Sequence, residues 1–152
     1  MSEKFRCLIR VRYGDCDAQG VVFNARYGDY VDVASTEYQR VTVGGYQAVL
    51  DAGIDFQAVK LNIEWKASAR FDEVLAIEVE TAHLGNTSYG LGFSMYEHYS
   101  NKLLATAQTV YVCVDGQSFE KKRIPDSVRA QLQDAAAGVL VNQAGITLDG
   151  DR

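Results

Sequence analysis

YGDCDAQGVVFNARYGDY, residues 13–30, decides the fold of this chain, because a glycine-containing loop leads here into a long amphipathic helix. Two acids, Asp15 and Asp17, sit in that loop. Backbone N–H groups at a helix start lack intrahelical partners and favour nearby negative charge. A carboxylate that faces such donors can act on a carbonyl that they polarise. The first hypothesis is therefore acyl chemistry at this loop.

The residues that follow the loop predict a helix of about five turns. Its apolar stripe recurs every three or four residues and consists of Tyr27, Tyr30, Val31, Ala34, Tyr38 and Val41. Asn24 suits the N-cap, and Gly44-Gly45 suit the helix end. A tyrosine-rich stripe buries a large area but needs partners for its hydroxyl groups. A shorter helix is expected over 46–52.

Alternating apolar residues predict about five strands, joined by short polar links that suit antiparallel neighbours. The expected strands are 5–13, 59–68, 74–84, 88–99 and 103–115, and a last helix is expected over 125–137. The pattern predicts an α+β fold in which a curved antiparallel sheet wraps one long central helix. Edge strands of such a sheet favour pairing between two protomers, so we expect a dimer at least.

Length and charge limit the possible classes of protein. The chain has 152 residues, which suits one domain, expected over 1–137; the tail 138–152 has a weak pattern that is compatible with partial disorder. A net charge of −5 argues against nucleic acid as the main partner. Neither a secretory signal nor a membrane-spanning run is visible. Three scattered cysteines without metal-ligand spacing predict reduced thiols in a cytoplasmic protein, and no metal or cofactor is expected.

Asp17 is the main catalytic candidate, as a nucleophile or as a general base that activates water. The substrate carbonyl oxygen would lie against backbone N–H groups near Asn24 and Ala25. The alternative is that Asp17 only hydrogen-bonds loop amides in an Asx-turn. Asp15 is expected to fix the loop. Cys16 is a poor nucleophile, because flanking aspartates disfavour its thiolate.

The rest of the loop is expected to border the substrate. Gly20 suits a position that needs a positive φ or a close approach by substrate. Val21, Val22 and Phe23 would supply an apolar wall.

The same stretch resembles the 4-hydroxybenzoyl-CoA thioesterase family of the hotdog-fold superfamily. The resemblance rests on Tyr13, Asp15-Cys16-Asp17, Gly20-Val21-Val22-Phe23 and Tyr27, and it extends to about Leu132, including 65–71. It implies hydrolysis of acyl-coenzyme A thioesters with Asp17 as the catalytic aspartate. It also implies homodimers or homotetramers with sites at the subunit boundary. Asn24 stands where one branch of the family has histidine and another tyrosine, and it cannot shuttle a proton at neutral pH.

Two other functions remain open from sequence. Hydratases and dehydratases of acyl thioesters share the fold, but they use histidine with an acid, and His83 and His98 lie far from the loop in sequence. A non-catalytic hotdog domain that binds an acyl thioester or a protein is the second alternative. For the coenzyme A phosphates, Arg70 and the run Lys121-Lys122-Arg123 are the candidate cations.

Overall fold

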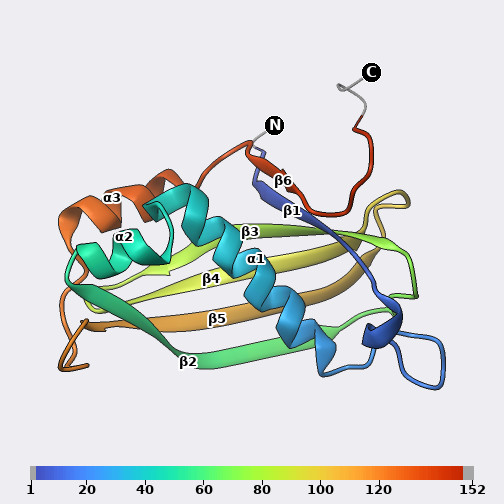
Figure 1. The fold of residues 1–152 in the computed structure, drawn as a ribbon, viewed down its shortest axis with the longest axis horizontal. Coiled ribbons are helices and arrows are strands. Elements are labelled where there is room, and N and C mark those ends of the chain that lie inside the picture. The colour runs from blue at the N-terminus through green and yellow to red at the C-terminus, as the bar shows by residue number, and fades with distance from the viewer. Residues whose placement is uncertain (1–2, 149–152) are drawn as a thin grey trace.

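One long helix lies against one face of a six-stranded sheet in the computed structural model, which describes residues 3–148 (Figure 1). The helices are α1 (Arg26–Val43), α2 (Tyr46–Asp51) and α3 (Asp126–Asp134), with a short 3-10 helix at Tyr13–Asp15. The strands are β1 (Phe5–Arg10), β2 (Ile54–Trp65), β3 (Val74–Leu84), β4 (Ser88–Glu97), β5 (Leu103–Asp115) and β6 (Leu140–Asn142). The expected α+β wrap is therefore confirmed.

The sheet order is β2-β5-β4-β3-β1-β6, and its strand pairs are antiparallel except for β1 with β6. The sheet is thus mixed and has one strand more than expected. Its extra strand comes from the tail, where 140–142 pair in parallel with 6–8 of β1. Of the tail expected over 138–152, the structure describes 138–148, and 149–152 lie outside the described residues.

Helix α1 crosses the sheet diagonally, with its first turns near β2 and its last turns near β3 (Figure 1). Its buried side chains are Tyr27, Tyr30, Val31, Ala34, Tyr38 and Val43, so Val43 replaces the expected Val41, which is 39% exposed. The tyrosine hydroxyls have the partners that burial requires. The Tyr38 hydroxyl bonds the Thr81 hydroxyl at 2.8 Å, and the Ala69 N–H donates to the Tyr27 hydroxyl at 3.2 Å.

Several element boundaries differ from the sequence expectations. Strand β1 ends at Arg10, because a 3-10 turn follows at 13–15. The expected N-cap at Asn24 is wrong: the cap position is Ala25, and no side chain caps the helix. Strand β2 begins at Ile54, directly after Gly53 with φ of 79°. Pro125 is the N-cap of α3 and not its first helical residue.

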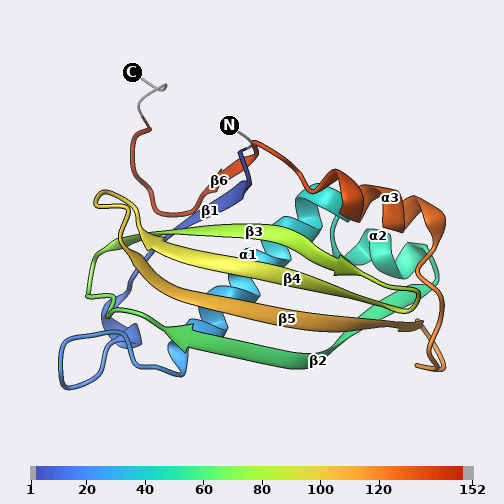
Figure 2. The same cartoon turned by 180° about the vertical axis from the view of Figure 1, so that it is seen from behind.

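The three helices lie on the same side of the sheet, and no helix of the described residues covers the opposite face of β2, β5, β4 and β3 (Figure 2). At one edge, β2 pairs only with β5 within the described chain. Its apolar side chains are correspondingly exposed, with Val59 at 59%, Leu61 at 49% and Trp65 at 52%. This edge lies beside the first turn of α1.

Candidate active site

The loop before α1 folds back on itself as a small hairpin. The Gly20 N–H donates to the Asp17 carbonyl at 3.0 Å, and the Asp17 N–H donates to the Val21 carbonyl at 2.9 Å. An isolated bridge joins Cys16 and Val22. Gly20 has φ of 77°, a left-handed conformation that glycine adopts without steric cost. The expected positive φ at Gly20 is confirmed.

Asp15 fastens this hairpin to the helix. Its side chain is buried, and its Oδ2 accepts hydrogen bonds from the Tyr30 hydroxyl at 2.9 Å and the Arg12 backbone N–H at 3.0 Å. Burial alone would raise the pKa of Asp15, but the hydrogen bonds from Arg12 and Tyr30 outweigh it and lower the pKa below its ordinary value. The Phe23 N–H also donates to the Asp15 carbonyl at 2.9 Å. Asp15 therefore holds the loop in place, as expected.

Asp17 lies at the turn of the hairpin with a partly buried side chain. Its Oδ1 accepts a hydrogen bond from the Gln19 backbone N–H at 2.8 Å, which is the Asx-turn considered from sequence. Within residues 3–148, no group donates to its second oxygen, Oδ2. The Asx-turn therefore fixes the carboxylate and leaves one oxygen available for chemistry.

A cavity of about 450 Å³ opens beside Asp17. It is bounded by the hairpin, the start of α1 and the end of β2, and it is lined by Asp17, Gln19, Val21, Val22, Asn24, Tyr27, Trp65, Lys66, Ala67 and Ser68. The Tyr27 and Trp65 rings meet edge to face with centroids 6.4 Å apart. The cavity thus combines a carboxylate with an aromatic and apolar wall.

The start of α1 contributes backbone donors to this region. The N–H groups of Arg26, Tyr27 and Gly28 are already bonded to carbonyls three residues earlier, at 2.8, 3.4 and 3.2 Å. In the described part of the chain, the N–H groups of Asn24 and Ala25 donate to no acceptor. Two unpaired donors at the positive end of an 18-residue helix are suited to an oxyanion.

The far wall of the cavity is formed by Lys66, Ala67 and Ser68, to which sequence reasoning gave no role. Its backbone is fixed at both ends: the Lys66 and Ala67 N–H groups donate to the Leu104 carbonyl at 2.8 and 3.1 Å, and the Val22 N–H donates to the Ala69 carbonyl at 2.9 Å. The Lys66 ammonium pairs with Glu64 at 3.6 Å. Lys66 and Ser68 are about fifty residues from the loop, so no local pattern could place them in the site.

Some of the sequence candidates lie beside the cavity and do not line it. Gly20 shapes the turn, the Phe23 side chain is 48% exposed, and Ala25 is the N-cap of α1. Arg70 bridges Val21 through its backbone. Its side chain is exposed and forms no ion pair with any residue in 3–148.

Three other candidates, Cys16, His83 and His98, do not line the Asp17 cavity. Burial, followed by the charges of Asp15 and Asp17, raises the pKa of the Cys16 thiol, so a thiolate is disfavoured as expected.

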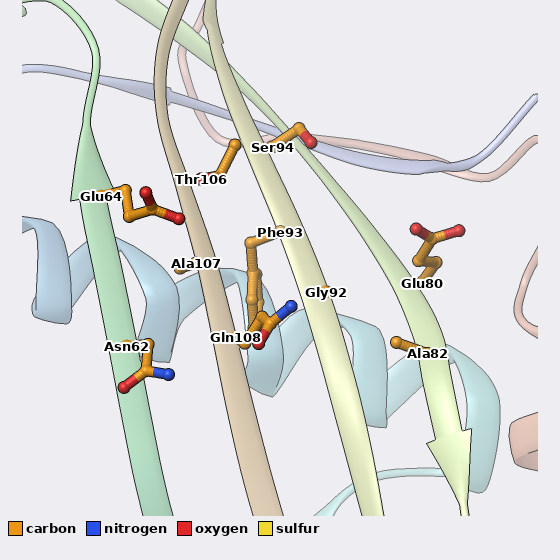
Figure 3. A pocket seen from close by; sticks show the side chains of 10 residues that line it. All are labelled: Asn62, Glu64, Glu80, Ala82, Gly92, Phe93, Ser94, Thr106, Ala107 and Gln108. Atoms are coloured by element: carbon orange, nitrogen blue, oxygen red, sulfur yellow. The ribbon is translucent and has the colours of Figure 1, made fainter.

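A second hollow, of about 270 Å³, lies on the sheet face opposite the helices (Figure 3). Its two acids are paired, Glu64 with Lys66 at 3.6 Å and Glu80 with Lys4 at 3.4 Å. It contains none of the candidate residues.

Within residues 3–148, no three histidine, cysteine or acidic side chains gather as metal ligands would. None of the described helices has both the length and the hydropathy that a bilayer span requires.

Comparison with known proteins finds relatives in both sequence and structure. The profile of the thioesterase-like superfamily matches residues 11–132. The acyl-CoA thioester hydrolase YbgC of Escherichia coli is 34% identical over 130 residues, which are 85% of this chain and 96% of that protein.

Two solved structures show the same fold. A 1,4-dihydroxy-2-naphthoyl-CoA thioesterase from Synechocystis superimposes with a TM-score of 0.78 and 20% identity, covering 86% of this chain and 96% of that one. The gentisyl-coenzyme A thioesterase BH1999 gives a TM-score of 0.73 and 25% identity, covering 84% and 98%.

Proposed function

Because this chain belongs to the thioesterase-like superfamily, we propose that Asp17 and the backbone N–H groups of Asn24 and Ala25, directly before α1, carry out its reaction, the hydrolysis of an acyl-CoA thioester. The chain is a thioester hydrolase, and its substrates are acyl-CoA or aroyl-CoA thioesters. The observation that carries the proposal is that one loop holds a carboxylate oxygen and two backbone N–H groups that have no hydrogen-bond partner within residues 3–148.

Each group has a distinct task in the proposed reaction. The N–H groups of Asn24 and Ala25 stabilise the negative charge that develops on the carbonyl oxygen. As a general base, Asp17 Oδ2 removes a proton from water while the water oxygen attacks the carbonyl carbon; the C–S bond then breaks, and coenzyme A thiolate takes up the proton. As a nucleophile, Oδ2 attacks the same carbon and expels the thiolate, and water then cleaves the acyl-aspartyl anhydride. Both routes release one carboxylic acid and one thiol.

The substrate would reach these groups through the Asp17 cavity. The acyl part would lie against Val22, Tyr27 and Trp65, which give the cavity its apolar surface. The pantetheine and nucleotide would leave the cavity along the protein surface. Arg70 is the proposed contact for a coenzyme A phosphate, because its exposed guanidinium has no acidic partner in the described residues.

The experiment is a thiol-release assay of the purified protein with short, long and aromatic acyl-CoA thioesters. We expect turnover of at least one of them, with equal amounts of free thiol and carboxylic acid. Binding of acyl-CoA without any thiol release would instead support the non-catalytic alternative. Hydration of an enoyl thioester that is abolished when His83 and His98 are both replaced would support the hydratase.

We also propose that two copies of the chain associate through β2. The edge carries exposed Val59, Leu61 and Trp65, and its outer backbone groups pair with no other strand among the described residues. The Asp17 cavity reaches the same edge through Trp65, so this pairing would bring a second chain beside the site. Analytical ultracentrifugation should show a dimer or tetramer, and a charge at Val59 (Val59→Lys) should shift it toward monomer. A monomeric wild-type protein at micromolar concentration would contradict this assembly.

A further inference from the structure

A cavity of about 310 Å³ opens at the start of β2 and has no part in the chemistry described above. It is lined by Leu50, Gly53, Asp115, Gly116, Gln117 and Lys122. Lys122 supplies its positive charge: the ammonium group lies 3.9 Å from Asp115 Oδ2, and the side chain is 45% exposed. An exposed ion pair at that distance contributes little to stability. The Lys122 ammonium is therefore available to a ligand that carries more negative charge than one carboxylate.

The coenzyme A nucleotide is such a ligand, because it carries several phosphate groups. The Asp17 cavity itself offers them little positive charge. Lys66, the cation that lines it, pairs with Glu64 at 3.6 Å, and Arg70 beside it supplies one guanidinium. The chain as a whole has a net charge of −5, which repels an anion. We therefore expect a further cation where the nucleotide lies.

Lys122 is too far from the Asp17 cavity of its own chain to be that cation there. A Cβ at Gly53, directly before β2, would lie 3.8 Å from Lys122 Nζ, whereas the Asp17 cavity is lined by Trp65, the last residue of β2. The 12 residues of this strand span about 35–40 Å. Figure 1 shows the site hairpin and the loop that follows β5 at opposite ends of β2. A nucleotide that contacts Lys122 must therefore belong to another site.

Pairing of two chains through β2 would bring Lys122 to such a site. A strand edge that pairs with the same edge of a second copy about a two-fold axis runs antiparallel to it, because donors must face acceptors along the whole edge. The start of the partner's β2 would then lie beside Trp65, at the end of β2 where the Asp17 cavity opens. The cavity that contains Lys122 of the partner subunit would come to the same place.

We propose that Lys122 binds a phosphate group of coenzyme A in the active site of the partner subunit. This inference rests on the proposed function and on the proposed pairing through β2. Each site then holds the nucleotide with one cation from each chain, Arg70 of its own chain and Lys122 of the partner subunit. An ammonium group binds phosphate as a compact point charge on a flexible stem, which suits a side chain that reaches across an interface.

A substrate without phosphate groups tests the ligand class. Lys122→Ala should raise KM by about fivefold for an acyl-CoA that the wild-type protein hydrolyses. It should leave kcat nearly unchanged, because the contact is the same in the ground state and the transition state. KM for the same acyl group on pantetheine, which lacks the nucleotide, should not change. Lys4→Ala is the matched control and should change neither KM, because Lys4 is 41% exposed and also pairs with an acid, Glu80, at 3.4 Å.

Mixing two impaired variants tests whether Lys122 acts across the interface. Asp17→Asn supplies the cation without the carboxylate, and Lys122→Glu supplies the carboxylate without the cation. A heterodimer of the two, isolated by two different affinity tags, contains one complete site and should show about half the wild-type kcat/KM for acyl-CoA.

Three results would overturn the inference. The heterodimer could keep only the low activity of Lys122→Glu, which would place Lys122 in the site of its own chain. Lys122→Ala could raise KM equally for acyl-CoA and acyl-pantetheine, or raise neither. The wild-type protein could hydrolyse acyl-CoA as a monomer. Failure of the wild-type protein to release thiol from any substrate would instead refute the proposed function.

Discussion

Replacing Asp15 by asparagine is expected to destabilise the protein strongly, because the carboxylate fastens the site hairpin to α1. Its Oδ2 accepts two hydrogen bonds, from the Tyr30 hydroxyl at 2.9 Å and the Arg12 N–H at 3.0 Å. A hydrogen bond to a charged group contributes about 1.5–3 kcal/mol, whereas a neutral one contributes about 0.5–1.5 kcal/mol. The Arg12 guanidinium is 74% exposed, so its ion pair with Asp15 adds little. Two weakened bonds give an expected loss of about 2–3 kcal/mol.

Urea denaturation at fixed protein concentration measures this loss. With a typical slope for a small protein, the midpoint for Asp15→Asn should fall by about 1–2 M. Asp29→Asn is the matched control, because Asp29 also pairs with an arginine three residues away, Arg26, but is 58% exposed. Its midpoint should change little. Equal midpoints for Asp15→Asn and the wild-type protein would refute the assigned role of Asp15.

The same carboxylate predicts how stability depends on pH. The pKa of Asp15 is lowered in the folded state, so its contribution is present above the ordinary pKa of 3.8 and is lost as pH falls through the lower folded value. The free energy of unfolding of the wild-type protein should therefore decrease below about pH 4. The difference between the wild-type protein and Asp15→Asn should shrink over the same range. A constant difference down to pH 2 would contradict this explanation.

Two further predictions concern the hairpin. Gly20→Ala places a side chain at φ of 77° and should lower the free energy of unfolding by about 1–2 kcal/mol, whereas Gly14→Ala, at ordinary φ and with open space around it, should be nearly neutral in the same denaturation experiment. Cys16, whose pKa is raised above 9.0 by burial, Asp15 and Asp17, should be alkylated by iodoacetamide slowly at pH 7 and faster only as the pH approaches and passes 9; mass spectrometry at several pH values measures this, and fast alkylation at pH 7 would contradict it.

The sequence predicted the parts of the fold that depend on local periodicity. The tyrosine stripe of α1 and the alternating residues of β3, β4 and β5 mark their elements, because each buries one face against the core. The turn before α1 could also be predicted, because Gly20 suits a positive φ and the neighbouring acids suit a helix start. The fold class and the reaction class followed from these elements and from the resemblance of the loop.

Long-range contacts account for what the sequence could not predict. Strand β6 has three residues and owes its place to pairing with β1, about 134 positions away, so it has no pattern of its own. Lys66 and Ser68 lie in the site because the Val22 N–H of the hairpin donates to the Ala69 carbonyl and holds this segment beside Asp17. Asn24 suits an N-cap by residue type, yet the helix starts one residue later and the Asn24 side chain borders the cavity.

The most direct test of the catalytic account is the kcat of Asp17→Asn in the thiol-release assay. Asparagine keeps the oxygen that accepts the Gln19 N–H at 2.8 Å, so the turn should remain intact and the thermal midpoint should be unchanged. An amide nitrogen in place of Oδ2 can neither take a proton from water nor attack a carbonyl. We therefore expect kcat to fall by about 100-fold or more. Turnover by the folded variant at the wild-type rate would show that another group performs the hydrolysis.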